Sequence, residues 1–171
     1  MSVKVIGLDL SMTSTGVCWS GPTGPEWTTI RTVANIGDGR LRVIQDRVRD
    51  IVADVGPDLV VIEGYLNHSK TAGITGMVHG AVRTTLMAAN IPYATFAPSS
   101  LKKYATGVGN ADKTRMALAA FKRGGIEFKD DNQCDAWWLW VAGMDHLGDP
   151  PLTVPVTNIE ALEKIRMEWT R

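Results

Sequence analysis

The sequence predicts a single α/β domain in which helices flank a mixed sheet of five strands. The first observation is a set of three short apolar or β-branched segments near the start, separated by turn residues such as Gly21 and Pro22. The second is that later segments of this kind alternate with segments of helical periodicity. Consecutive strands then pair antiparallel, and strands joined through helices pair parallel. The expected strands are residues 3–9, 14–20, 27–33, 58–63 and 93–96.

Five helices are expected around this sheet. In the segment 41–55 apolar residues recur at helical spacing, Asp38 stands at the N-cap position, and Gly56 follows the last residue. The remaining helix candidates are 69–89, which is rich in small residues, a helix that opens at Pro98, 112–123 and 131–146.

Composition is that of one ordinary globular domain. The chain has 171 residues, long enough for one core and short for two. We expect residues 1–148 to form the domain and residues 149–171 a tail, in which Thr157 and Glu160 make a capping box for a short helix. No apolar run approaches the ~20 residues that span a bilayer, and the start lacks a signal-peptide cleavage site. These observations predict a cytoplasmic protein with no membrane contact.

Charge is distributed unevenly along the chain. The formal net charge is zero, yet residues 60–123 hold eight basic side chains against two acidic ones, Glu63 and Asp112. A basic stretch of this kind favours contact with nucleic-acid phosphates. The basic residues are Lys70, Arg83, Lys102, Lys103, Lys113, Arg115, Lys122 and Arg123.

Two carboxylates end apolar strands of the expected sheet. Asp9 ends the first strand and Glu63 ends the fourth. Taken singly, Asp9 is also typical of a turn cap and Glu63 of a surface residue beyond the sheet. Together they are more informative, because parallel strands bring their carboxyl ends to one edge, where α/β sheets bind ligands.

The stretch 129-KDDNQCDAWWLW-140 adds further acids at the start of the last long helix. Asp130 or Asp131 can cap this helix, but Asp131 and Asp135 are four residues apart and share one face, where like charges repel. Two carboxylates ~4 Å apart repel by about 1 kcal/mol in water and about 4 kcal/mol at an effective dielectric of 20. A divalent cation reverses this cost. Oxygen ligands without a Cys/His pattern favour Mg²⁺ or Mn²⁺, and two such ions are the usual device for cleaving a phosphodiester.

Four pieces of the sequence resemble the RuvC family of Holliday-junction resolvases, in the RNase H-like superfamily. They occur in the family's order, and the third is the most specific. They are 7-GLDLSMTSTG-16, 60-VVIEGY-65, 98-PSSLKKYATGVGNADKTRM-116 and 131-DNQCDA-136. The resemblance implies an RNase H-like fold and a homodimer. It also implies symmetric cutting of four-way junctions that leaves 5′-phosphates, and we expect two metal ions per site. The sequence leaves open whether forks and flaps are further substrates.

The resemblance also implies roles for individual residues. Asp9, Glu63 and Asp135 fall on the family's metal-binding acids. The fourth acid differs, since many bacterial members carry Asp or His where this chain has Asn132. Asp131, one residue earlier, resembles the placement in phage and mitochondrial relatives, so Asp131 is the expected fourth catalytic ligand and Asn132 a neutral ligand or orienting group. The expected DNA-binding residues are Lys102, Lys103, Lys113, Arg115, Lys70, Tyr65 and Leu66.

A second departure concerns the residue that opens the junction centre. The bacterial family has a phenylalanine three residues after the strand-end glutamate, and this chain has Leu66. Leucine can wedge a base step but stacks poorly, so Tyr65 and His68 are alternative stacking groups. The two departures favour a bacteriophage enzyme that works in the host's bacterial cytoplasm.

Three other functions remain open at this point. An actin-like or sugar-kinase ATPase module shares the first phosphate-loop pattern, but no second glycine-rich loop is found. An RNA-processing nuclease of the same superfamily lacks the K-K-x-x-T-G segment. A junction-binding module without nuclease activity gains nothing from several carboxylates near phosphate. The tryptophans that follow the acids, Trp137, Trp138 and Trp140, are expected in the core.

Overall fold

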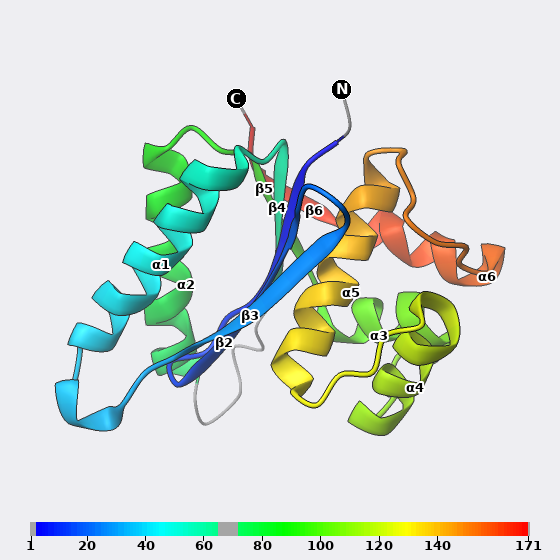
Figure 1. Cartoon of the computed structure of the whole chain (residues 1–171), viewed down its shortest axis with the longest axis horizontal. Helices are drawn as coiled ribbons and strands as arrows, with labels where there is room; N and C mark the ends of the chain where they lie inside the picture. Colours follow the sequence, from blue (N-terminus) through cyan, green and yellow to red (C-terminus); the bar gives the residue numbers. More distant parts are fainter. Residues whose placement is uncertain (1–2, 65–71, 171) are drawn as a thin grey trace.

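The computed structural model describes residues 3–64 and 72–170 as one mixed sheet between two layers of helices (Figure 1). The strand order is β3-β2-β1-β4-β5-β6. β1, β2 and β3 pair antiparallel, β4 and β5 run parallel to β1, and β6 is antiparallel to β5. The predicted α/β class is confirmed. The strands are β1 (Val5–Asp9), β2 (Ser14–Ser20), β3 (Pro25–Arg31), β4 (Leu59–Glu63), β5 (Tyr93–Phe96) and β6 (Arg166–Trp169).

The predicted number of five strands was wrong, because the tail adds a sixth. β6 is only four residues long, is largely exposed and contains no β-branched residue, so it gives no strand signal in sequence. It forms because the edge of β5 is available for pairing, and the Thr95 hydroxyl donates to Glu168 at 2.9 Å. The predicted capping box was also wrong, since Thr157 lies inside the short helix α6 (Val156–Ile159) and not at its start.

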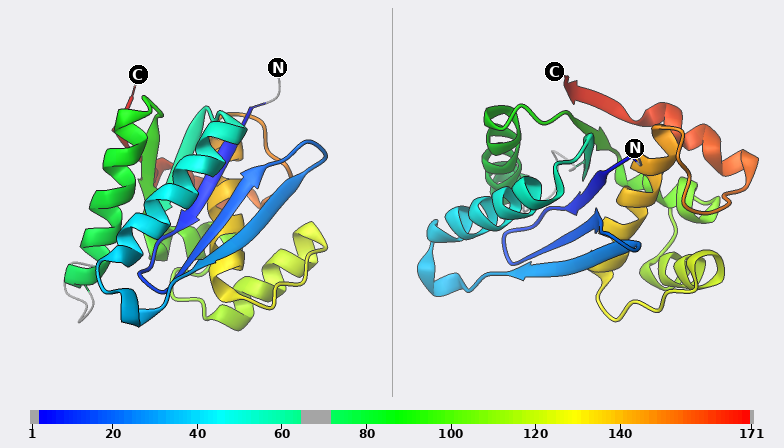
Figure 2. Two further views of the ribbon diagram at one scale, coloured as in Figure 1. Left: turned by 60° about the vertical axis from the view of Figure 1, so that its left-hand side comes forward. Right: turned by 45° about the horizontal axis from the view of Figure 1, so that its top comes forward.

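The helices cover the two faces of the sheet unequally. One face carries two long helices, and the other carries three together with the tail (Figures 1 and 2). Asp38 precedes α1 but has helical backbone angles and no capping hydrogen bond, so its predicted capping role was wrong. The helices are α1 (Gly39–Val55) and α2 (Ala72–Ala88) on the first face, and α3 (Pro98–Thr106), α4 (Lys113–Gly124) and α5 (Asp131–His146) on the second, with short 3-10 turns η1 (Ala34–Ile36) and η2 (Glu160–Lys164).

Helix α5 is the central element of the second face, and its tryptophans anchor it. Trp137 and Trp138 are almost completely buried and contact each other edge to face, with ring centroids 4.8 Å apart. Each buried indole of ~200 Å² stabilises the fold by about 5 kcal/mol of transfer free energy. The prediction that these residues belong to the core is confirmed. Their packing fixes the position of the acidic first turns of the same helix.

Two glycines allow α5 to lie directly on the sheet. A Cβ atom at Gly7 of β1 would collide with the backbone of Ala136, and one at Gly16 of β2 would collide with the carbonyl of Asn132. Both positions therefore require glycine as long as α5 keeps this distance. The close approach brings the first two turns of α5 against the carboxyl end of β1.

The described residues contain neither a disulfide nor a helix that could cross a membrane. Cys18 and Cys134 are both buried as free thiols. Within residues 3–64 and 72–170, no helix has the length and apolar character needed to span a bilayer.

Candidate active site

Asp9 and Glu63 end neighbouring parallel strands at the same edge of the sheet. Leu8 precedes Asp9 on β1, Ile62 precedes Glu63 on β4, and these two residues are paired directly in the parallel sheet. Both carboxylates are half-buried. The expectation that the two strand-end acids lie side by side is thus consistent with the observed register.

Asp135 of α5 adds a third carboxylate to this edge. Burial, and then the charge of Asp135, raises the pKa of Asp9 from 3.8 to about 7. Burial, followed by the charges of Asp9 and Asp135, raises the pKa of Glu63 from 4.5 to about 9. Burial also raises the pKa of Asp135 to about 6, against the lowering effect of Lys102. Charge repulsion from Asp135 and Asp9 thus adds to burial in raising the pKa values of Asp9 and Glu63, and a cation between the carboxylates would relieve this repulsion.

Asp131 lies one helical turn before Asp135 and is more exposed. It forms an ion pair with Lys113 at the start of α4. Lys113 also acts on the other acids, because its charge lowers the pKa of Asp9 and of Asp135. We name Asp9, Glu63, Asp131 and Asp135 the acid cluster. Lys113 and Lys102 of α3 are the cations that border it.

Asp130 organises the start of α5. Its carboxylate accepts hydrogen bonds from the Thr29 hydroxyl at 2.7 Å, from Arg31 at 2.9 Å, and from the backbone and side-chain nitrogens of Asn132 at 3.0 and 2.9 Å. The charge of Asp130 thus links β3 to α5 and caps the helix. Because the Asn132 amide nitrogen is directed at Asp130, the Asn132 side-chain oxygen is the atom left for another contact.

Sequence reasoning missed Thr29 and Arg31, and saw in Asp130 only a helix cap. Thr29 and Arg31 are two residues apart on β3, so their side chains lie on the same face of the sheet. This spacing can be read from the sequence. The contact of β3 with the start of α5 cannot, because it depends on tertiary packing.

The donors at the acid cluster fit a hard divalent cation in chemistry, since they are oxygens with unrelieved mutual repulsion. In the described side-chain positions, however, no group of three or more His, Cys, Asp or Glu residues surrounds a common point closely enough to hold a metal ion. Asp131 is turned toward Lys113. Holding an ion would therefore draw these carboxylates closer together and compete with Lys113 for Asp131.

The other expected DNA-binding residues divide into two groups. Lys102 and Lys103 lie on α3, and Arg115 lies on the first turn of α4, where its backbone N–H donates to the N-cap Asp112 at 2.8 Å. Lys103 and Arg115 are exposed and Lys102 is half-buried. Lys70, Tyr65 and Leu66, with His68, lie outside the described residues.

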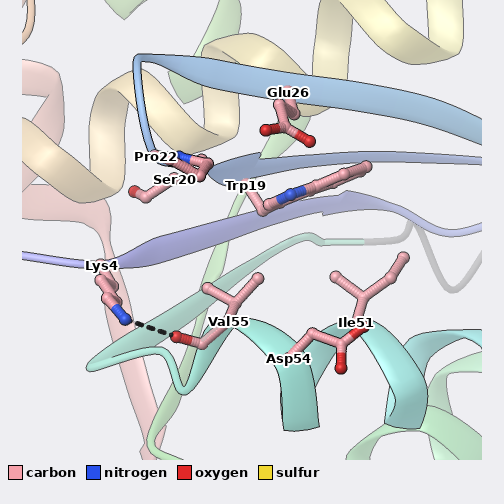
Figure 3. Close-up of a pocket in the computed structure, with 9 residues that line it drawn as sticks. Lys4, Trp19, Ser20, Pro22, Glu26, Ile51, Asp54 and Val55 are labelled. Atoms are coloured by element: carbon pink, nitrogen blue, oxygen red, sulfur yellow. Dashed lines mark hydrogen bonds between the residues drawn. The ribbon is translucent and has the colours of Figure 1, made fainter.

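A separate cavity of about 620 Å³ lies at the opposite edge of the sheet. It is bordered by the β2–β3 turn and the end of α1, with Trp19 between them (Figure 3). Lys4, just before β1, donates from its ammonium to the Val55 carbonyl at 3.0 Å. Since the acid cluster lies at the other end of β1, this cavity is no part of it.

Comparison with known proteins identifies the family. The sequence model described as "Crossover junction endodeoxyribonuclease RuvC" matches residues 6–124, about 70% of the chain. The chain belongs to the RuvC family. The match includes Asp9, Glu63 and the basic residues of α3 and α4, and it ends before α5. The predicted family is confirmed, and with it the enzyme class of crossover junction endodeoxyribonuclease. Membership also decides against the ATPase and RNA-processing alternatives.

Individual RuvC relatives agree with this assignment. The chain is 28% identical to RuvC of Paracidovorax citrulli over 124 residues, covering 67% of this chain and 68% of the relative. It is 26% identical to RuvC of Carboxydothermus hydrogenoformans over 155 residues, covering 85% and 98%.

Solved structures of RuvC and of a mitochondrial resolvase have the same fold. Thermus thermophilus RuvC superimposes with a TM-score of 0.71 at 20% identity, covering 90% of this chain and 100% of that one. The same protein in complex with a Holliday junction substrate gives 0.71 at 21% identity, with 90% and 99% covered. The yeast mitochondrial Holliday junction resolvase gives 0.53 at 12% identity, with 95% and 81% covered.

Proposed function

We propose that this chain is a structure-selective endodeoxyribonuclease that resolves Holliday junctions, and also cuts forks and flaps, by phosphodiester hydrolysis that leaves 5′-phosphates. The observation that carries the proposal is the convergence of Asp9, Glu63 and Asp135 from β1, β4 and α5, where the charge of Asp135 raises the pKa of Asp9, and the charges of Asp9 and Asp135 raise the pKa of Glu63. Membership of the RuvC family supports it independently. An isolated set of repelling acids beside two lysines is the arrangement that cation-assisted cleavage of a polyanion needs.

RuvC family nucleases are metal-dependent, and the acid cluster is where this chain would hold Mg²⁺ or Mn²⁺, two ions per active site. Asp9, Glu63 and Asp135 are the main ligands in this proposal, Asp131 is the fourth, and Asn132 is a neutral neighbour. When bound, the ions activate the attacking water and stabilise the leaving oxygen. The chain itself supplies the carboxylates from β1, β4 and α5. The buried tryptophans hold α5 in place, so the carboxylates of this helix stay in one position relative to the sheet.

Basic side chains beside the acid cluster would hold the DNA backbone. Lys102, Lys103, Lys113 and Arg115 are carried by α3 and α4, which follow one another around the same end of the molecule. Lys113 has a double part in this proposal, because it pairs with Asp131 in the free protein and is available to phosphate once a cation takes that carboxylate. Lys70, Tyr65 and Leu66 are assigned to the same DNA surface from the sequence.

A pair of chains would supply the two active sites that symmetric cutting requires. The face of α2 supports pairing, because Ile74 and Met77 are 49% and 43% exposed, and Gly73 and Gly80 have no neighbouring atoms within 4 Å of an added Cβ. In the same proposal residues 1–148 are the nuclease domain and 149–171 its C-terminal tail. The positions of Asp131 and Leu66 favour a phage origin and action in a host bacterial cytoplasm.

The test is cleavage of a synthetic four-way junction by purified protein, with Mg²⁺, Mn²⁺ or EDTA, beside a linear duplex and a fork. We expect nicks in opposing strands of the junction, none in EDTA and none in the duplex. The Asp135→Asn variant should bind the junction and leave it intact. Failure of the wild-type protein to cut any branched DNA with either metal would contradict the proposal.

A further inference from the structure

A groove of about 580 Å³ lies beside the acid cluster, between α4 and the segment that leads into α5. One wall of the groove is a single face of α4, since the α4 residues that line the groove recur every three or four positions. They are Thr114, Ala117, Leu118 and Phe121, with Lys113 at the end of the row. The opposite wall consists of Glu127, Phe128 and Asp131. The volume is in the range of small-molecule sites.

The two walls differ in how firmly they are held. The Phe128 ring is fixed by two neighbours, with centroids 5.2 Å from Trp27 and 5.7 Å from Trp137. On the facing wall Leu118 is 48% exposed and Phe121 is 56% exposed. The groove therefore has one rigid aromatic wall and one uncovered apolar wall, which suits a flat apolar group inserted between them.

The groove is continuous with the acid cluster. A narrow cleft of about 10 Å³ is lined by Lys113, Ala117, Phe128 and Asp131, which also line the groove, and by Asp135. A phosphate bound at the acid cluster thus has the mouth of the groove beside it. Whatever is covalently attached to that phosphate is the nearest candidate to enter.

Charges around the groove favour a strand of nucleic acid. On the other side of Leu118 a hollow of about 330 Å³ is lined by Arg115, Lys122 and Arg123. With these cations on one side and Lys113 at the groove itself, phosphates find basic groups next to an apolar slot. Proteins that bind single-stranded nucleic acid use this combination, with bases on aromatic rings and backbone on basic groups.

We propose that this groove holds an unpaired nucleobase of the cleaved strand, next to the scissile phosphate, stacked on Phe121. The inference rests on the proposed function and names a subsite of it. The base must be unpaired, because a paired base is stacked within the duplex and unavailable to a side pocket. Branch points supply such bases more readily than linear duplex does. The groove would therefore help the enzyme to select branched DNA and the position of the cut.

The first experiment removes the base and the ring in turn. Cleavage sites are mapped on a junction, and then a tetrahydrofuran abasic residue replaces each nucleotide that flanks the cut. Base–aromatic stacking predicts that one abasic position lowers kcat/KM of the wild type by about 5- to 150-fold. Phe121→Ala should lower kcat/KM on the intact junction similarly and show no further loss on the abasic one. Leu118→Ala is a second groove variant, and Val156→Ala, at an exposed position on α6, is the matched control.

A second readout does not depend on cutting. With 2-aminopurine at the sensitive position and EDTA present, the wild-type complex should fluoresce less than the Phe121→Ala complex, because stacking quenches the base. Equal fluorescence, or an abasic penalty that is absent or the same in both proteins, would overturn the subsite. Thermal unfolding of each variant checks that the fold is kept.

Two other results are distinguishable. If the wild type cuts no branched DNA, the proposed function fails. In that case 2-aminopurine is placed in turn at each position around the branch point, and its fluorescence in EDTA with the wild type and with Phe121→Ala still decides whether a base enters the groove. If a labelled acidic peptide with a phenylalanine binds the wild type but not Phe121→Ala, while all DNA readouts are equal, the groove belongs to a protein partner and the nucleobase inference is refuted.

Discussion

Replacing Asp9 by Asn should stabilise the metal-free protein, and by more at pH 8 than at pH 5. Burial, and then the charge of Asp135, raises the pKa of Asp9 from 3.8 to about 7. An acid whose pKa is raised in the folded state destabilises the folded protein once it is ionised. The free energy of unfolding therefore falls as the pH rises from about 4 to about 7. At about 1.4 kcal/mol per pH unit, the largest cost is about 4 kcal/mol at pH 8 and about 1.5 kcal/mol at pH 5. Because Asp9 shares this repulsion with Asp135 and Glu63, each value is an upper limit.

The assay is urea unfolding in EDTA, followed by the fluorescence of the buried tryptophans at both pH values. Asp46→Asn is the control, because Asp46 is ion-paired with Arg42 and Arg49 on α1 and its pKa is lowered, so its loss should bring no gain at either pH. Added Mg²⁺ should stabilise the wild type more than Asp9→Asn. An equal gain at pH 5 and pH 8, or a loss of stability at pH 8, would refute the electrostatic account of the cluster.

The remaining predictions concern single side chains. Asp135→Asn should abolish junction cleavage in Mg²⁺ but leave gel-shift affinity within a few-fold; loss of both would indicate a folding role. Lys113→Ala should weaken binding and reduce the slope of log affinity against log salt by about 1, and an unchanged slope would remove Lys113 from the phosphate contacts. Asp130→Asn should raise the Mg²⁺ concentration for half-maximal cleavage by roughly 10-fold, because it orients Asn132 and the start of α5; unchanged metal titrations would contradict this. Asp131→Asn should raise the metal requirement more than Asn132→Ala does, and the reverse order would make Asn132 the fourth ligand.

Most of the fold follows from local sequence signals. The long apolar patterns around residues 41–55 and 131–146 predict helices whose observed bounds agree within two residues. β6 escaped prediction because its pairing with β5 depends on a free sheet edge and not on its own composition. Asp38 and Thr157 were assigned capping roles from residue type and position in the sequence, whereas capping depends on backbone angles that the sequence pattern does not specify.

The sequence predicted the part of the candidate site that depends on strand ends and on helical spacing. Strand ends and helical spacing were enough to suggest that Asp9, Glu63 and Asp135 meet. The network of Thr29, Arg31 and Asp130 was not predictable, because it joins residues about 100 positions apart through the packing of β3 on α5. The groove on α4 was missed for the same reason, since an exposed Phe121 acquires meaning only beside Phe128 and the acid cluster.

The most direct measurement of the central claim is nucleotide-resolution mapping of the cuts in a four-way junction, followed by treatment of the products with DNA ligase. The account predicts cuts at symmetric positions in two opposing strands, only with Mg²⁺ or Mn²⁺, and nicks that ligase seals because they carry 5′-phosphates. Cuts in one strand only, products that ligase cannot seal, or equal cutting of linear duplex would contradict it.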